Sequence, residues 1–148
     1  MTAYYDLINF LKETFESDAD VQSVVTGDWE EWAQDEFPLV HIDVESSQFI
    51  ASSNISRFTV NISVASIRDF NNEDVKDKFW HNDNRHDNWN KTHKILKEAY
   101  LKIAKDNGNV TIADFNEAQI LTWAYMNGLD GWQQTWIIDV DDFNTSAC

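Results

Sequence analysis

The densest group of potential metal ligands in this chain lies between residues 81 and 93. It comprises His81, Asp83, His86, Asp87 and His93. Imidazole and carboxylate groups bind divalent metals, but there is no HExxH pair and no cysteine partner, and His86 and His93 are seven positions apart. We favour helix capping, in which Asn or Asp precedes a helix and first-turn acids interact with its dipole. A metal-dependent enzyme is kept as a third alternative.

Other chemical motifs are weaker still. The segment from Asp69 to Glu73 resembles the first half of a calcium loop, but position six is Asp74 instead of glycine and position twelve is Trp80. The one cysteine, Cys148, is terminal, and no GxSxG elbow, phosphate loop or dinucleotide fingerprint occurs. The sequence therefore predicts a protein that is not an enzyme and carries no cofactor or metal.

Length, composition and charge limit the classes of protein to which this chain can belong. The chain has 148 residues, 43% of them hydrophobic, which predicts one folded domain over residues 1–148. Its formal net charge is −15, from 26 acidic and 11 basic residues, so the surface as a whole should not attract nucleic-acid phosphates. Without a signal peptide or a run of about 20 apolar residues, we expect a soluble protein that assembles inside a cell and contacts no membrane.

The first half of the chain predicts a helix and then strands. Helical spacing of apolar residues covers 2–17, and a short strand is expected at 21–26. Alternating residues after Pro38 predict a second strand, 46–54 should be a polar link, and Phe58 to Ala65 show the cleanest alternation in the sequence. One face of that strand should meet the core and the other is small and polar.

The second half predicts a loop, a helix and a hairpin. Residues 69–87 are rich in Asn and Asp, with one helical turn at 75–80, and a second amphipathic helix should cover 84–105. A strand at 117–126 should pair through a turn at 127–131 with a last strand that carries Trp132, Trp136, Ile138 and Val140 on one face. Trp89, Trp132 and Trp136 are expected in the core.

These elements together predict an α+β domain. We expect a mainly antiparallel sheet of about four to five strands with two main helices packed on one face. The other face, lined with Thr, Asn, Gln and Ser, suits contact with water or with another subunit. Trp29 and Trp32 lie in an acidic loop with Asp28, Glu30 and Glu31, where exposed indoles are costly unless something covers them, so these five residues are the candidate subunit interface.

Three segments resemble a known family. They are VVTGDW followed by FPLVHIDV, the stretch FWHNDNRHDNWNKTHKILKEAYLKI, and GLDGWQQTWIIDV. Together they are similar to the tail-terminator, tail-completion or neck-ring proteins of tailed bacteriophages, in particular to versions from phages related to the crAss-like group. The likeness covers nearly the whole chain, but departs from the family pattern at residues 28–36, where Trp29 and Trp32 replace a more aliphatic stretch.

The resemblance implies a structural virion protein. Such a protomer closes into a six-fold or twelve-fold homo-oligomeric ring at the head–tail junction, as a tail terminator or as a neck or connector component. It contacts tail-tube or portal-adaptor proteins and leaves an axial passage for DNA without specific binding. The expected location is the virion tail or neck, after assembly in the host cytoplasm.

A second class of function fits the same charge. An acidic inhibitor or DNA-mimic protein would use −15 on one small domain to bind a basic partner. Self-assembly distinguishes the two classes, because a mimic should stay monomeric or dimeric whereas a ring protein forms a closed oligomer.

The two loop tryptophans give the first test. Replacing Trp29→Ala together with Trp32→Ala should leave the circular-dichroism spectrum and the melting temperature nearly unchanged but impair assembly, since the indoles are expected to contact another subunit. Size-exclusion chromatography with light scattering measures the assembly. Unfolding of the double variant would instead assign both indoles to the core.

Overall fold

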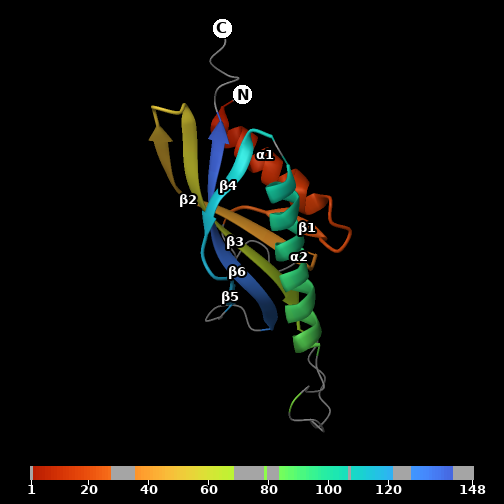
Figure 1. Ribbon diagram of the computed structural model, residues 1–148. Coiled ribbons are helices and arrows are strands. Elements are labelled where there is room, and N and C mark those ends of the chain that lie inside the picture. The colour runs from red at the N-terminus through yellow and green to blue at the C-terminus, as the bar shows by residue number, and fades with distance from the viewer. Residues whose placement is uncertain are drawn as a thin grey trace.

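The computed structural model describes residues 2–27, 36–68, 79, 84–106, 108–121 and 128–141. Two helices and six strands follow one another along the chain, and Figure 1 shows their arrangement. In chain order they are α1 (Ala3–Glu16), β1 (Ser23–Val25), β2 (Leu39–Ile50), β3 (Ile55–Ile67), α2 (Arg85–Lys105), β4 (Val110–Phe115), β5 (Gln119–Ile120) and β6 (Leu129–Asp141).

All six strands form one mixed, mostly antiparallel sheet. Its strand order is β1-β2-β3-β6-β4, and β5 also pairs with β6. Only β1 and β2 are parallel; β2 with β3, β3 with β6, β4 with β6 and β5 with β6 are antiparallel. The predicted α+β class with a mainly antiparallel sheet is confirmed.

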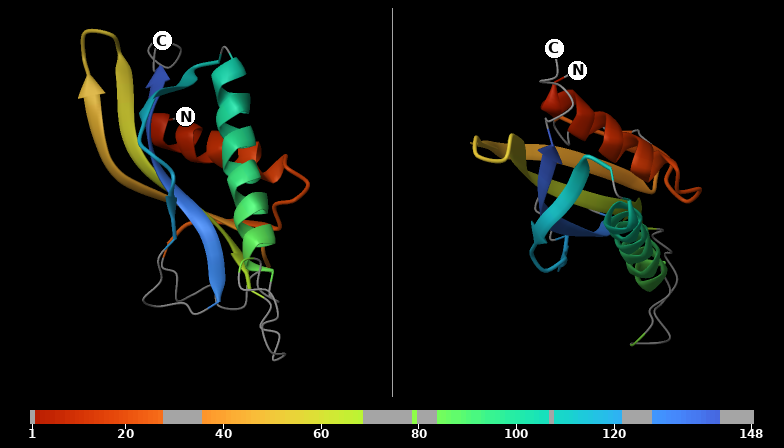
Figure 2. Two further views of the ribbon diagram at one scale, coloured as in Figure 1. Left: turned by 60° about the horizontal axis from the view of Figure 1, so that its bottom comes forward. Right: turned by 45° about the horizontal axis from the view of Figure 1, so that its top comes forward.

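Both helices bury an apolar stripe at helical spacing. In α1 the stripe is Leu7, Leu11 and Phe15. In α2 the buried apolar residues are Ile95, Leu96, Ala99 and Ile103. These side chains pack on one face of the sheet against alternate residues of β2, β3 and β6, as period-2 strands require. The two predicted helices are therefore confirmed, and α2 packs against the sheet (Figure 2).

Trp136 lies at the centre of the core. Its side chain is fully buried, stacks on Phe15 of α1 at a centroid distance of 6.1 Å, and meets Tyr100 of α2 edge-on at 6.3 Å. The indole Nε1 donates to Gln134 Oε1 at 2.8 Å, so its polar atom is satisfied. The predicted core position of Trp136 is confirmed, whereas Trp89 and Trp132 are only partly buried.

The opposite face of the sheet is less polar at one end than predicted. There Ala65, Leu121 and Leu129 form a small second cluster with Phe37 against it. A Cβ on Gly131 would lie 2.0 Å from the carbonyl oxygen of Val64 and 2.8 Å from Leu121 Cδ1, so only glycine allows Leu121 to pack across this strand. Asn61, Thr59, Gln133 and Thr135, further along this face, keep the predicted polar character.

One expectation about strand boundaries is wrong. Residues 46–54 do not form a polar link, because β2 continues to Ile50 beyond a bulge between Val44 and Ser46 that shifts the alternation. Of the strand expected at 117–126, Gln119 and Ile120 pair with the last strand as predicted, and residues 122–127 lie outside the described residues. β4 was not expected from the sequence.

A buried carboxylate joins the sheet to the start of α2. Asp130 is 1% exposed and accepts hydrogen bonds from both Nε and Nη2 of Arg68. Asn88 of α2 donates to Asp130 Oδ2 at 3.2 Å and to the Ile67 carbonyl at 2.9 Å. Because these donors satisfy both carboxylate oxygens, the cluster fixes the helix on the sheet.

Removing this carboxylate should destabilise the protein. Asp130→Ala removes the carboxylate that accepts from the 22% exposed Arg68 and from Asn88, and we expect a loss of about 3 kcal/mol in the free energy of unfolding. Urea denaturation measures the change. Asp139→Ala, which breaks the more exposed ion pair with Arg57, is the matched control and should cost much less. Equal losses would contradict a special role for Asp130.

Candidate functional site

The end of the β2–β3 hairpin projects beyond the helices (Figure 2). We call residues Ser46–Ser56 the hairpin arm. These eleven consecutive residues carry no charge, in a chain of which 25% is charged. Phe49 is 63% exposed on the arm, and Ile50 and Ile55 flank its turn and are half-buried. Charged residues normally protect exposed strand edges from association, so this arm is suited to being covered by protein.

Local geometry makes the arm a defined structure. Its turn runs from Ala51 to Asn54, where Asn54 adopts a positive φ of 53°, a conformation that asparagine tolerates. At its base, Arg57 donates to both carboxylate oxygens of Asp139 on β6, at 2.7 and 2.9 Å. The hydrogen bond with Asp139 and its negative charge raise the pKa of Arg57 above its ordinary value.

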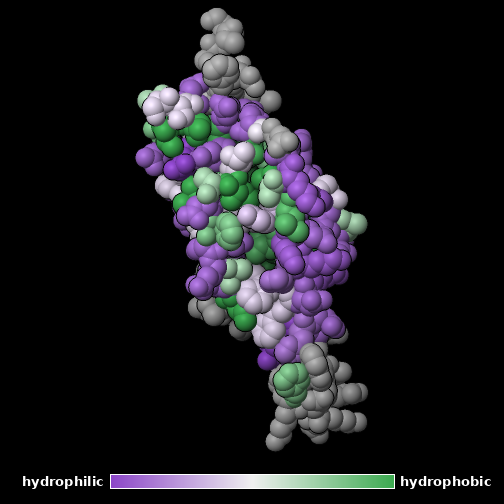
Figure 3. All heavy atoms as spheres, viewed as in Figure 1, coloured by the Kyte–Doolittle hydropathy of each residue, from purple (hydrophilic) through white to green (hydrophobic). Residues whose placement is uncertain are grey.

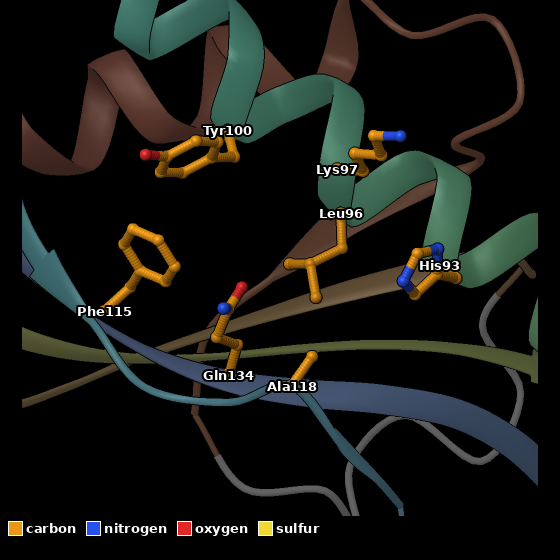
Figure 4. Close-up of a pocket in the computed structure, with 7 residues that line it drawn as sticks. All are labelled: His93, Leu96, Lys97, Tyr100, Phe115, Ala118 and Gln134. Carbon is orange, nitrogen blue, oxygen red and sulfur yellow. The ribbon is translucent and has the colours of Figure 1, made fainter.

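A cleft lies between α2 and strands β4 and β6, at the edge of the sheet opposite to β2. It encloses about 250 Å³ and is lined by His93, Leu96, Lys97, Tyr100, Phe115, Ala118 and Gln134. Tyr100 from α2 and Phe115 from β4 lie together at one end of the cleft, and Leu96, Gln134 and Ala118 follow along it (Figure 4). The rings of Tyr100 and Phe115 are in edge-to-face contact, with centroids 4.9 Å apart. We call this the aromatic cleft.

The polar group inside the cleft is held in place. Gln134 Nε2 donates to the Asn116 carbonyl at 2.7 Å, while its Oε1 accepts from Trp136. Since both ends of this amide are occupied, the cleft presents mainly aromatic and aliphatic surface. Phe115 is 49% exposed at its rim. The cleft is therefore suited to a hydrophobic or aromatic group.

The arm and the cleft lie at opposite edges of one sheet. Within the described residues, β1 is the one strand on the outer side of β2. It pairs with β2 at Leu39, Val40 and His41. The remaining outer edge of β2, Ile42 to Ile50, has no strand beside it within those residues. At the other edge, β6 is the one strand that pairs with β4 in the described part of the chain. In Figure 3, hydrophobic residues reach the surface over the hairpin and along the seam between β4 and α2.

Charge is distributed unevenly over the elements. α2 contains six basic and two acidic residues, a formal charge of +4, so the rest of the chain carries −19. Lys91, Lys94, Lys97, Lys102 and Lys105 are all exposed. The expectation that the surface as a whole should not attract phosphates therefore does not extend to α2, which carries a local positive charge.

The candidate interface residues from the sequence, Asp28, Trp29, Glu30, Glu31 and Trp32, lie outside the described residues. The candidate metal ligands His81 and Asp83 also lie outside them. His86 stacks on Phe79 and meets Trp89 edge-on, and His93 meets Trp132 edge-on. Within the described part of the chain, no three His, Cys, Asp or Glu side chains come together as a metal site.

Sequence reasoning missed both the arm and the cleft. The run from Ser46 to Ser56 carries no charge, but neither do residues 58–67 or 118–129, so charge alone does not identify the arm. The cleft brings together α2, β4 and β6 and has no local signature. In comparisons with known proteins, no family model and no curated protein matches this chain. Among the helices that the structure describes, none is long and apolar enough to cross a membrane.

His41 couples the polar face of the sheet to pH. The residue is 6% exposed, and its Nε2–H donates to the Gly27 carbonyl at 2.9 Å. Burial lowers the pKa of His41 below its ordinary 6.5, although the bond to Gly27 and the charge of Asp43 act in the opposite direction. Between the lowered pKa and 6.5 the unfolded chain binds more protons, so the free energy of unfolding should fall as pH falls through this range.

The variant His41→Gln should reduce this pH dependence. The wild type should lose more unfolding free energy between about pH 7.5 and pH 5.5 than the variant does, because glutamine does not titrate. Urea denaturation at both pH values gives the difference. His93→Gln, which removes an exposed imidazole, is the control. The same pH slope in wild type and His41→Gln would contradict the assignment.

Proposed function

We propose that this protein is a structural virion component that forms a ring of identical copies at the head–tail junction of a tailed phage. The observation that carries the proposal is the placement of two association-prone features at opposite edges of one sheet: an uncharged projecting arm and an aromatic cleft. Because the two features differ, a contact between them is heterologous, and repeated heterologous contacts close into a ring when the rotation permits.

The chemistry of the described residues agrees with a role that depends on shape. The buried carboxylate Asp130 is fully engaged by Arg68 and Asn88, and Gln134 in the cleft is held at both ends. These side chains hold the helices, strands and loops of the domain in place. From the resemblance of three segments to phage tail-terminator and neck proteins, we assign the ring the role of a tail terminator or neck connector, in contact with tail-tube or portal-adaptor proteins, with an axial passage through which DNA moves.

The strongest competing function is an acidic inhibitor that mimics DNA and binds a basic protein. The charge of −19 outside α2 favours it. The two functions differ in what they require of the arm: a ring needs a copy of the protein to cover it, whereas a mimic acts as a monomer or dimer through its carboxylates.

Assembly of the purified protein tests the proposal. At high concentration, or with the tail-tube protein of the same phage, light scattering should give a mass that is six or twelve times 17.2 kDa, or another closed multiple. Negative-stain micrographs should show rings with a central hole. A monomer or dimer under all these conditions would reject the ring and favour the mimic.

A further inference from the structure

We infer that the hairpin arm of one copy docks along β4 of a second copy, with Phe49 entering that copy's aromatic cleft. This inference rests on the proposed ring and specifies its contact. The occupant of the cleft is thus an aromatic side chain from an identical chain. Three properties of the described residues support it: strand direction, the face on which Phe49 lies, and the chemistry of the two surfaces.

Strand direction permits the sheets of neighbouring copies to join. β2 is antiparallel to β3, β3 to β6, and β6 to β4, so β2 and β4 run in opposite directions within one copy. When a second copy lies edge to edge in the same orientation, its β4 is antiparallel to the β2 of the first. Backbone hydrogen bonds can then form between the two edges, as in β-strand addition.

Phe49 lies on the face of the sheet that the contact requires. It pairs with Ser56, two residues from Phe58, whose side chain belongs to the core on the helix-bearing face. Phe115 pairs with the core residue Trp136 and contacts Tyr100 of α2, so it lies on the same face. Joining the two edges therefore brings Phe49 to the side on which the cleft opens.

The two surfaces match in size and polarity. A protein cavity of about 150 Å³ holds a benzene molecule, so the 250 Å³ cleft has room for a phenylalanine ring. Tyr100 and Phe115 offer the ring edge-to-face partners. The arm has no charged group between Ser46 and Ser56, so docking removes no ion of the arm from water.

A symmetric dimer satisfies these features less well. Pairing β2 with β2 would cover both arms and leave both clefts open. Pairing β4 with β4 would cover both clefts and leave both arms exposed. Only the heterologous contact covers both features of every copy.

Complementary variants test the contact. Phe49→Ser removes the anchor and keeps the cleft, whereas Phe115→Ser removes a wall of the cleft and keeps the arm. Each variant alone should associate at least about 30-fold more weakly than the wild type, the effect of truncating an interface hot spot. Mixed at equal concentrations, the two should form a one-to-one dimer and nothing larger, because one intact arm and one intact cleft remain. Sedimentation velocity measures these species.

Two controls keep the test decisive. Tyr5→Ser removes an equally exposed aromatic residue, 61% exposed on α1, and should assemble as the wild type does. If Phe115→Ser unfolds the protein, Lys97→Trp takes its place in the test. An indole at this exposed position of α2 should fill the cleft and weaken association as much as loss of Phe115 would.

The outcomes separate this inference from the ring itself. If the wild type assembles and Phe49→Ser assembles equally well, the arm contact is wrong while the ring stands. If the mixture of Phe49→Ser and Phe115→Ser stays monomeric, the contact is likewise wrong. A wild type that never assembles rejects the ring.

Discussion

The antiparallel pairing of β3 with β6 is the interaction on which the rest of the structure depends. Thirteen residues of each strand, Ile55–Ile67 and Leu129–Asp141, pair without interruption across more than sixty intervening residues. β2 attaches to the outer side of β3, and β4 and β5 attach to the outer side of β6. Both helices pack on the face that these two strands build. A one-residue slip here would exchange the core and solvent faces of the central sheet.

The sequence predicted the helices and the central strands because burial imposes a strong period there. Leu7, Leu11 and Phe15 repeat at helical spacing, and Phe58, Val60, Ile62 and Val64 alternate without a break. The predictions were wrong where a bulge shifts the alternation. The bulge after Val44 disguised the second half of β2, and a register shift between Ile112 and Asp114 divides the short β4.

The candidate site was harder to predict for a different reason. Tyr100, Phe115 and Gln134 belong to three elements, and nothing in their local sequence indicates that they share a cleft. Their proximity follows from the β4–β6 register and from the position of α2, which are tertiary properties. The arm was no easier to predict, since residues 58–67 and 118–129 also form uncharged runs and nothing local distinguishes them from Ser46–Ser56. Its meaning depends on knowing that the run forms a projecting hairpin.

The position of the lysines on α2 has a consequence for how copies meet. α2 carries a formal charge of +4, whereas the rest of the chain carries −19. When two molecules approach, their lysine-bearing helices therefore repel each other, and each helix is attracted to carboxylates of the other molecule. Encounters that bring α2 against acidic side chains of a second copy are thus favoured before the two surfaces touch.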